Sequence, residues 1–197
     1  ITAMAMVTKN IKFYSNVLKL PVRDPLLTAK QVSTAAYLSN NRVGLGIGLS
    51  PWPEDFELLN QQWSNRGPRS AEMVEIIRGV MTGDMFEFHG KYYDIPRLQI
   101  APVSSEPVPI YIGGLAEPVL KRAARIADGY LGLGTPDLTF DDQRDLIKRI
   151  HQYREDYGRA DQPFEIKMGP YDPDVNKIWA LRDIGVTDVV LTPEIYY

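Results

Sequence analysis

The chain has 197 residues, of which 44% are hydrophobic and 24% charged, and its formal net charge is −3. These values are typical of a globular domain with a core of its own, and they argue against disorder and against a basic surface for nucleic acid. The sequence contains no cysteine, which excludes a disulfide scaffold, a cysteine-ligated zinc site and a cysteine nucleophile.

Neither a membrane segment nor a secretion signal is indicated. No apolar run approaches the roughly 18–20 residues that a membrane helix needs. The first ten residues, ITAMAMVTKN, lack a basic start followed by a long apolar stretch. We therefore expect a cytoplasmic protein without a membrane partner.

Short apolar runs alternate with helix-like segments along the chain. Residues 11–20 predict a strand that runs into a loop, and Pro25 to Leu38 predict a helix with Asp24 as its N-cap. Residues 84–94 predict a β-hairpin that turns at His89-Gly90. Further strands are predicted at 42–48, 110–114, 130–134, 164–169 and 186–193, and further helices at 70–81, 118–127, 140–157 and 173–184.

Six strands separated by helices favour a parallel sheet, either open or closed into a barrel. An open doubly wound sheet is the structural alternative. A closed (β/α)8 barrel usually needs about 250 residues. We therefore interpret residues 1–197 as a single α/β domain, a barrel that lacks its first two β/α units, with a hairpin insertion around residues 84–108.

Four stretches carry a combination of motifs. They are PLLTAKQVSTAAYLSNNRVGLGIG, SPWPEDFELLNQQWSNRGPRSAEMVEIIRGVMTG, FEFHGKYYDIPRLQIAPVSSEPVPIYIGG and EPVLKRAARIADGYLGLG. In this order and spacing they resemble the luciferase-like monooxygenase family, particularly its coenzyme F420-dependent branch. The resemblance implies an incomplete (β/α)8 barrel of the TIM-barrel type, coenzyme F420 or alternatively FMN as cofactor, and a homodimer.

Sites in such barrels lie at the C-terminal ends of the strands. Gly113 and Gly114 end a strand before a helix, where glycine permits close approach and the helix start offers N–H groups to an anion. The resemblance places the cofactor phosphate at this turn, which includes Leu115. A tight β/α turn without a ligand is the alternative.

Three other segments are candidates for cofactor contacts. Gly48 and Ser50 are predicted to line the ring or the ribityl chain, although small residues also fill barrel interiors, and a lone G-x-G is no dinucleotide fingerprint. Gly132 and Gly134 are predicted to leave room at the barrel mouth, with an ordinary strand terminus as the alternative. The resemblance places a non-prolyl cis peptide between Asn16 and Val17, where it would support the cofactor ring; the alternative is an ordinary trans strand end.

Charged and aromatic candidates are weighed against structural roles. Glu54, Asp55 and Glu57 face a substrate or form a solvated acidic loop, and we favour the loop. The other candidates are Arg66 and Arg69 as anchors of the loop–helix junction, Lys167 and Asp172 at a strand end, and Trp52 and Trp63 as a lid or as core. His89 and His151 lack a ligand partner at useful spacing, so no metal site is predicted.

No acid–base pair stands out, which fits a redox enzyme whose cofactor supplies the hydride chemistry. We therefore predict an F420-dependent oxidoreductase that transfers a hydride between the deazaflavin and a small organic substrate. The alternatives are an FMN-dependent two-component monooxygenase, a non-catalytic cofactor-binding remnant and, last, a phosphate-binding barrel isomerase or aldolase. No catalytic residue is assigned, because the resemblance places the acid or base on a strand that precedes this sequence.

Overall fold

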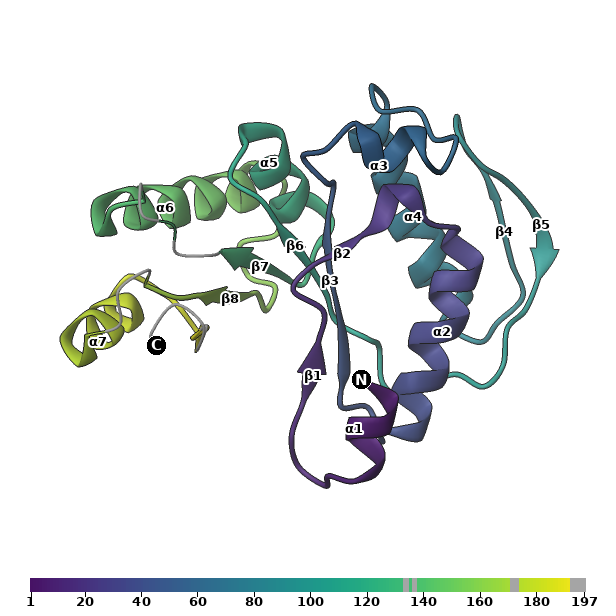
Figure 1. Cartoon of the computed structure of the whole chain (residues 1–197), viewed down its shortest axis with the longest axis horizontal. Coiled ribbons are helices and arrows are strands. Elements are labelled where there is room, and N and C mark those ends of the chain that lie inside the picture. Colours follow the sequence, from purple (N-terminus) through teal and green to yellow (C-terminus); the bar gives the residue numbers. More distant parts are fainter. Residues whose placement is uncertain (133–134, 136–137, 171–173, 192–197) are drawn as a thin grey trace. The chain divides into compact units, whose positions relative to one another are not determined.

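The computed structural model describes residues 1–132, 135, 138–170 and 174–191. The chain forms two compact units, Ile1–Ile110 and Tyr111–Tyr197, and each contains parallel strands and helices (Figure 1). The first unit contains α1 (Thr2–Met6), β1 (Phe13–Tyr14), β2 (Leu18–Lys19), a 3-10 turn (Leu20–Val22), α2 (Pro25–Leu38), β3 (Val43–Gly48), α3 (Glu54–Glu57), α4 (Arg66–Val80), β4 (Phe86–His89) and β5 (Asp94–Leu98). The second contains β6 (Ile110–Gly113), α5 (Glu117–Ile126), β7 (Gly129–Gly132), α6 (Phe140–Asp156), β8 (Glu165–Met168), α7 (Val175–Asp183) and β9 (Asp188–Val189).

The first predicted strand is present as two short pieces. Both β1 and β2 pair in parallel with β3, with Phe13 opposite Val43 and Lys19 opposite Gly48. Every residue of β3 is buried, as expected for a parallel strand covered on both faces. The register places the end of β2 beside the end of β3.

The two long helices of the first unit lie side by side (Figure 1). α2 begins as predicted, because the Asp24 carboxylate accepts the Leu27 N–H at 2.8 Å and Pro25 occupies the first turn. α4 begins at Arg66, four residues before the predicted Ser70. Pro68 is accommodated there because first-turn N–H groups have no intrahelical partner, so it does not delay the helix.

The predicted hairpin is confirmed, since β4 and β5 pair in antiparallel fashion, but its turn lies at residues 90–93 rather than at His89-Gly90, because His89 pairs with Asp94. Its turn is fixed to α4 by one carboxylate. Glu72 accepts the backbone N–H groups of Lys91 and Tyr92, each at 2.8 Å, and that of Tyr93 at 3.2 Å. These charge-assisted hydrogen bonds hold the insertion against the first unit.

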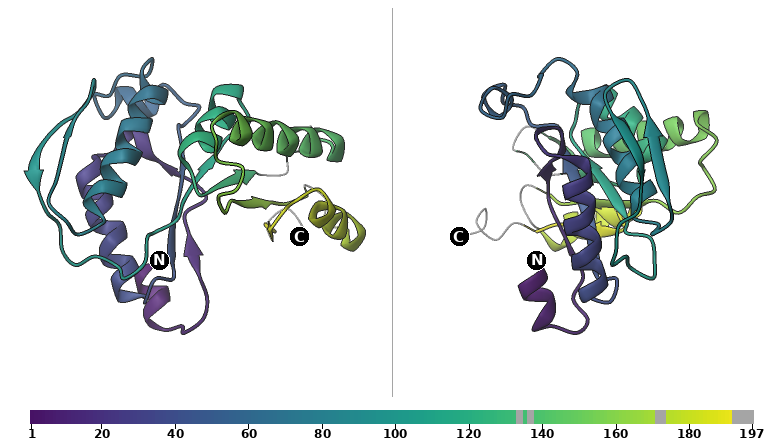
Figure 2. Two further views of the ribbon diagram at one scale, coloured as in Figure 1. Left: turned by 180° about the vertical axis from the view of Figure 1, so that it is seen from behind. Right: turned by 90° about the vertical axis from the view of Figure 1, so that its right-hand side faces the viewer.

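The second unit is a four-stranded parallel sheet in the order β6-β7-β8-β9. In its register Tyr111 lies opposite Gly129, and Gly129 opposite Glu165. α5 and α6 lie side by side in this unit (Figure 2). Their apolar faces are buried and comprise Val119, Leu120, Ala123 and Ala124 of α5 and Leu146, Ile147 and Ile150 of α6.

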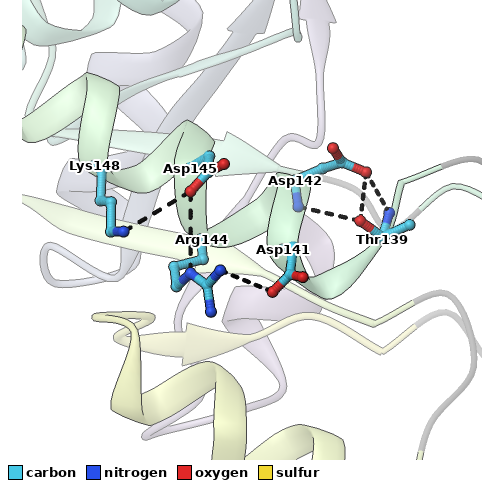
Figure 3. Close-up of polar contacts among 6 residues, drawn as sticks. All are labelled: Thr139, Asp141, Asp142, Arg144, Asp145 and Lys148. Carbon is cyan, nitrogen blue, oxygen red and sulfur yellow. Dashed lines mark hydrogen bonds and ion pairs between the residues drawn. The ribbon is translucent and has the colours of Figure 1, made fainter.

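The start of α6 shows how local sequence sets a helix boundary (Figure 3). Thr139 Oγ1 accepts the Asp142 N–H at 3.2 Å, and the Asp142 carboxylate accepts the Thr139 N–H at 2.9 Å. This reciprocal capping box begins the helix at Phe140, as predicted. One turn further, Arg144 pairs with Asp141 at 2.9 Å on the exposed surface.

Candidate functional site

The break between β1 and β2 contains the predicted cis peptide. The bond between Asn16 and Val17 is cis, as the resemblance implies, and the role of these residues in supporting a cofactor ring stays a prediction. The preceding residue joins the break to β3: the Ser15 hydroxyl donates to the Gly46 carbonyl at 2.8 Å and accepts the Gly46 N–H at 3.2 Å. The Val17 side chain is exposed, so it is accessible to a ligand.

Ser50 follows the end of β3 in a left-handed conformation, with φ at +62° and the side chain buried. Such a φ is uncommon for a residue other than glycine. Two hydrogen bonds hold the turn: Ser50 Oγ donates to Asp55 Oδ2 at 2.5 Å and accepts the Trp52 N–H at 3.2 Å. A hydroxyl has one donor and two acceptor positions, and these two hydrogen bonds use the donor and one of the acceptor positions of Ser50.

Asp55 corrects the prediction of a wholly solvated acidic loop. Glu54 and Glu57 are exposed, but the Asp55 carboxylate also receives Lys19 Nζ at 2.6 Å. Hydrogen bonds from Lys19 and Ser50 hold the pKa of Asp55 below its ordinary value of 3.8. Lys19 and Asp55 are 36 positions apart in the sequence. The feature of the sequence that could have indicated their contact is the lysine near the end of an otherwise apolar segment.

The two loop tryptophans have different environments. Trp63 packs edge-to-face on buried Phe56 with ring centroids 5.0 Å apart, while the Arg66 guanidinium lies 3.4 Å from its centroid. Trp52 is 56% exposed, and Lys19 Nζ lies 4.4 Å from its ring centroid. Trp63 is therefore a packing residue, and Trp52 is available to a ligand.

Arg69 anchors the loop–helix junction as predicted. Its guanidinium is buried and donates to Gln61 Oε1 at 2.6 Å and to Asn65 Oδ1 at 3.1 Å. The loop that carries Trp52 and Asp55 is thus tied to the first turn of α4.

The turn after β6 is built from backbone groups. Gly114 has φ at +135°, and a Cβ placed on it would lie 3.2 Å from Val119 Cγ1. α5 then begins at Glu117 without a side-chain cap. Pro118 has no N–H and the Val119 N–H donates to the Ala116 carbonyl at 2.8 Å, so the first turn contributes the Glu117 N–H beside the N–H groups of the preceding turn. Leu115 is exposed. This donor set suits an anion such as a phosphate.

Two side chains support this turn. The buried Tyr130 hydroxyl donates to the Gly114 carbonyl at 3.0 Å. Glu117 places a negative charge at the start of α5, but Arg149 pairs with it at 3.0 Å. The turn is therefore fixed, and its acidic neighbour is matched by a cation.

The predicted opening at the end of β7 is partly wrong. A Cβ on Gly132 would lie 2.5 Å from Met168 Cε, so the space beside Gly132 is filled by core packing. Gly134 lies outside the described residues.

Lys167 is buried within β8 rather than aimed at a strand end. Its Nζ lies 2.8 Å from Glu165 Oε2, 2.9 Å from Asp188 Oδ2 and 4.9 Å from the Tyr111 ring centroid. The Tyr111 hydroxyl also donates to Glu165 at 2.7 Å. This cluster is an internal charge network of the second unit. Asp172, the other predicted residue, lies outside the described part of the chain.

Neither histidine has metal-ligand surroundings. His89 Nδ1 lies 2.5 Å from Asp94 Oδ1 at the exposed hairpin, and His151 lies in α6. Over residues 1–132, 135, 138–170 and 174–191, no group of three His, Asp or Glu side chains is placed to hold a metal ion. Within the same ranges, no helix has the length and apolarity to cross a membrane.

The family comparison identifies the class of protein. The family described as luciferase-like monooxygenase matches residues 1–170, so the chain belongs to that family. It is 47% identical over 191 residues to an uncharacterized protein of Mycobacterium tuberculosis strain H37Rv, a match covering 96% of this chain and 64% of that protein. The chain thus spans less than two thirds of that relative.

Two relatives have named activities. An F420-dependent glucose-6-phosphate dehydrogenase of Amycolatopsis mediterranei is 32% identical over 133 residues, covering 66% of this chain and 40% of that enzyme. An FMNH2-dependent dimethylsulfone monooxygenase of Pseudomonas fluorescens is 28% identical over 135 residues, covering 67% and 37%.

The fold is shared with a solved structure, the F420-dependent tetrahydromethanopterin reductase of Methanopyrus kandleri. The TM-score is 0.73 at 21% identity, covering 85% of this chain and 52% of that one. This likeness confirms the predicted α/β class and the incomplete barrel of the luciferase-like type.

Proposed function

We propose that this chain carries cofactor-binding elements of an F420-dependent oxidoreductase, which transfers a hydride between the deazaflavin and a small organic substrate. The proposal extends to a homodimer in the cytoplasm. An F420-dependent enzyme among the relatives supports it, at 32% identity over 133 residues. The observation that carries it is the backbone turn at Gly113, Gly114 and Leu115 before the uncapped start of α5.

Each unit by itself offers groups that suit a part of such a cofactor. The turn after β6 offers N–H groups to its phosphate, and glycine lets the backbone approach closely. The cis peptide between Asn16 and Val17 is proposed to support the ring, and Gly48 and Ser50 are proposed to line the ring or the ribityl chain. When bound, the deazaflavin supplies the hydride chemistry, and the protein supplies position and electrostatics.

FMN is the second candidate, with a monooxygenase reaction in place of hydride transfer to an organic substrate. The observation that favours it is the FMNH2-dependent relative, 28% identical over 135 residues. A phosphate turn and small residues at strand ends suit both cofactors, so the comparison must be made by direct binding.

Titration of the purified chain with F420 and, separately, with FMN tests the proposal by the change in cofactor fluorescence. We expect saturable binding of F420 in the micromolar range. FMN binding alone would move the assignment to the monooxygenases. Binding of neither would overturn the proposal and favour a non-catalytic remnant.

The substitution Gly114→Ala locates the phosphate. It forces a side chain into a conformation with φ at +135° and toward Val119, and it is expected to weaken cofactor binding about tenfold. Gly185→Ala is the matched control, because φ is +101° there and the nearest atoms lie 3.9 Å away. Equal cofactor affinity of the Gly114→Ala variant and the wild type would show that the phosphate does not bind at this turn.

A further inference from the structure

An ammonium, an indole and a carboxylate meet at the carboxyl ends of β2 and β3. Lys19 Nζ lies 2.6 Å from Asp55 Oδ2 and 4.4 Å from the centre of the Trp52 ring. The parallel register, which sets Lys19 opposite Gly48, brings the lysine to the loop that follows β3. The arrangement is therefore produced by the sheet rather than by local sequence.

The positive charge of Lys19 is already matched at this place. Asp55 is ionised at neutral pH, because hydrogen bonds from Lys19 and Ser50 hold its pKa below the ordinary value. An incoming phosphate would find the ammonium paired with a carboxylate and would be repelled by that carboxylate. An uncharged group meets no such opposition.

Trp52 supplies the contact surface. The residue is 56% exposed although Lys19 lies against its ring. Indole rings bind apolar and aromatic groups by stacking and edge contacts. Ser50 accepts the Trp52 N–H at 3.2 Å, so the backbone that carries the ring is fixed before a ligand arrives.

We propose that Trp52, together with the Lys19–Asp55 ion pair, receives the organic part of the substrate and selects an uncharged, apolar or ring-bearing group over a phosphorylated one. The inference rests on the proposed function, because it takes the strand ends as the substrate side of the enzyme. Asp55 is then a specificity-determining residue: it neutralises a lysine that would otherwise attract anions.

The test uses tryptophan fluorescence of the full chain without cofactor, with benzyl alcohol and phenyl phosphate as matched neutral and anionic probes. Wild-type protein is expected to bind benzyl alcohol with quenching and to bind phenyl phosphate at least about threefold more weakly. Trp52→Phe assigns the signal, because Trp63 and Trp179 remain. Loss of the quenching in that variant is expected.

The substitution Asp55→Asn keeps an oxygen that accepts from Ser50 but removes the charge that matches Lys19. Phenyl phosphate should then bind about threefold to fivefold more tightly, while the affinity for benzyl alcohol stays within about twofold. The double variant Lys19→Gln with Asp55→Asn should lose this gain. Circular dichroism and thermal melting establish that each variant is folded.

Lys19→Gln alone provides an opposite test if Asp55→Asn does not fold. It leaves the Asp55 carboxylate unmatched, so phenyl phosphate should bind still more weakly than to wild type. The proposal is overturned if wild type binds phenyl phosphate as tightly as benzyl alcohol or if neither probe quenches Trp52 fluorescence. It is also overturned if the ratio of the two affinities is the same in wild type and in the Asp55 and Lys19 variants. Because the probes are read without cofactor, failure here is distinct from failure to bind F420 or FMN.

Discussion

Two lysines of this protein make similar contacts in different surroundings. Lys19 lies beside the Trp52 ring and one carboxylate, and its side chain is 38% exposed. Lys167 lies beside the Tyr111 ring and two carboxylates, and its side chain is 7% exposed. The same contacts are thus near the surface at Lys19 of the first unit and in the interior at Lys167 of the second.

The difference in burial determines what each lysine can do. Removing one partner of a buried charge network leaves the other charges uncompensated, which is costly, whereas an exposed ion pair contributes little to stability. Lys167 is therefore expected to maintain the fold of the second unit. Lys19 is expected to contribute little to stability, which is consistent with the proposed role of its ion pair in substrate recognition.

The largest expected effect tests the structural half of this comparison. Lys167→Met keeps most of the apolar stem but removes the cation that Glu165 and Asp188 share. We expect a loss of about 2 kcal/mol in the free energy of unfolding, reduced from the fully buried case because both carboxylates are half-exposed. Urea denaturation of the two proteins measures the difference.

Lys148→Met is the matched control for that substitution. Lys148 pairs with Asp145 at 3.8 Å, and its side chain is 69% exposed. Its removal should change the free energy of unfolding by less than about 0.5 kcal/mol. If both substitutions changed the free energy of unfolding equally, burial would not explain the contribution of Lys167 to stability.

The pH dependence of the same difference is the next prediction. Burial would raise the pKa of Glu165, but hydrogen bonds from Lys167 and Tyr111 outweigh it and leave the pKa below its ordinary value of 4.5. A lowered pKa in the folded protein adds stability above pH 4.5 that disappears as the pH falls through the folded value.

The advantage of wild type over Lys167→Met should therefore shrink as the pH falls from 7 to 3. Burial opposes the charge of Lys167 as well, but its carboxylate partners outweigh burial and raise its pKa above the ordinary 10.5. Lys167 therefore stays charged from pH 3 to pH 7, so the change over this range comes from protonation of Glu165. The stability that comes from the raised pKa of Lys167 itself is lost only as the pH rises through its folded value, above 10.5. Denaturant titrations at pH 3, 5 and 7 check this, and an unchanged difference would exclude Glu165 as a partner.

Local signals explain why much of the fold was predictable from sequence. Asp24 with Pro25, and Thr139 with Asp142, set the starts of α2 and α6 within a few residues. The start of α4 is predicted four residues too late, although Pro68 fits the first turn of a helix. The cis peptide between Asn16 and Val17 followed only from the family resemblance, and the break between β1 and β2 was not predicted, since nothing in the composition of residues 11–20 marks it.

The candidate site was less predictable because its main contacts join distant positions. Gly113 and Gly114 are recognisable from their place between a strand and a helix. The Lys19–Asp55 contact depends on the register of β2 against β3, which the sequence alone does not specify. Gly132 shows the opposite error, because a glycine at a strand end was interpreted as open space when Met168 fills it.

The smallest expected effect completes the comparison of the two lysines. Lys19→Met should lower Tm by no more than about 2 °C, because the pair it removes is partly exposed to solvent. Ser50 still donates to Asp55 in this variant, so the turn after β3 keeps one of its side-chain contacts. Differential scanning calorimetry beside Lys167→Met measures both shifts. If Lys19→Met lowered Tm as much as Lys167→Met, Lys19 would be needed to hold the loop after β3 in place. An effect of Lys19 on substrate binding at Trp52 could then arise from unfolding of that loop rather than from recognition.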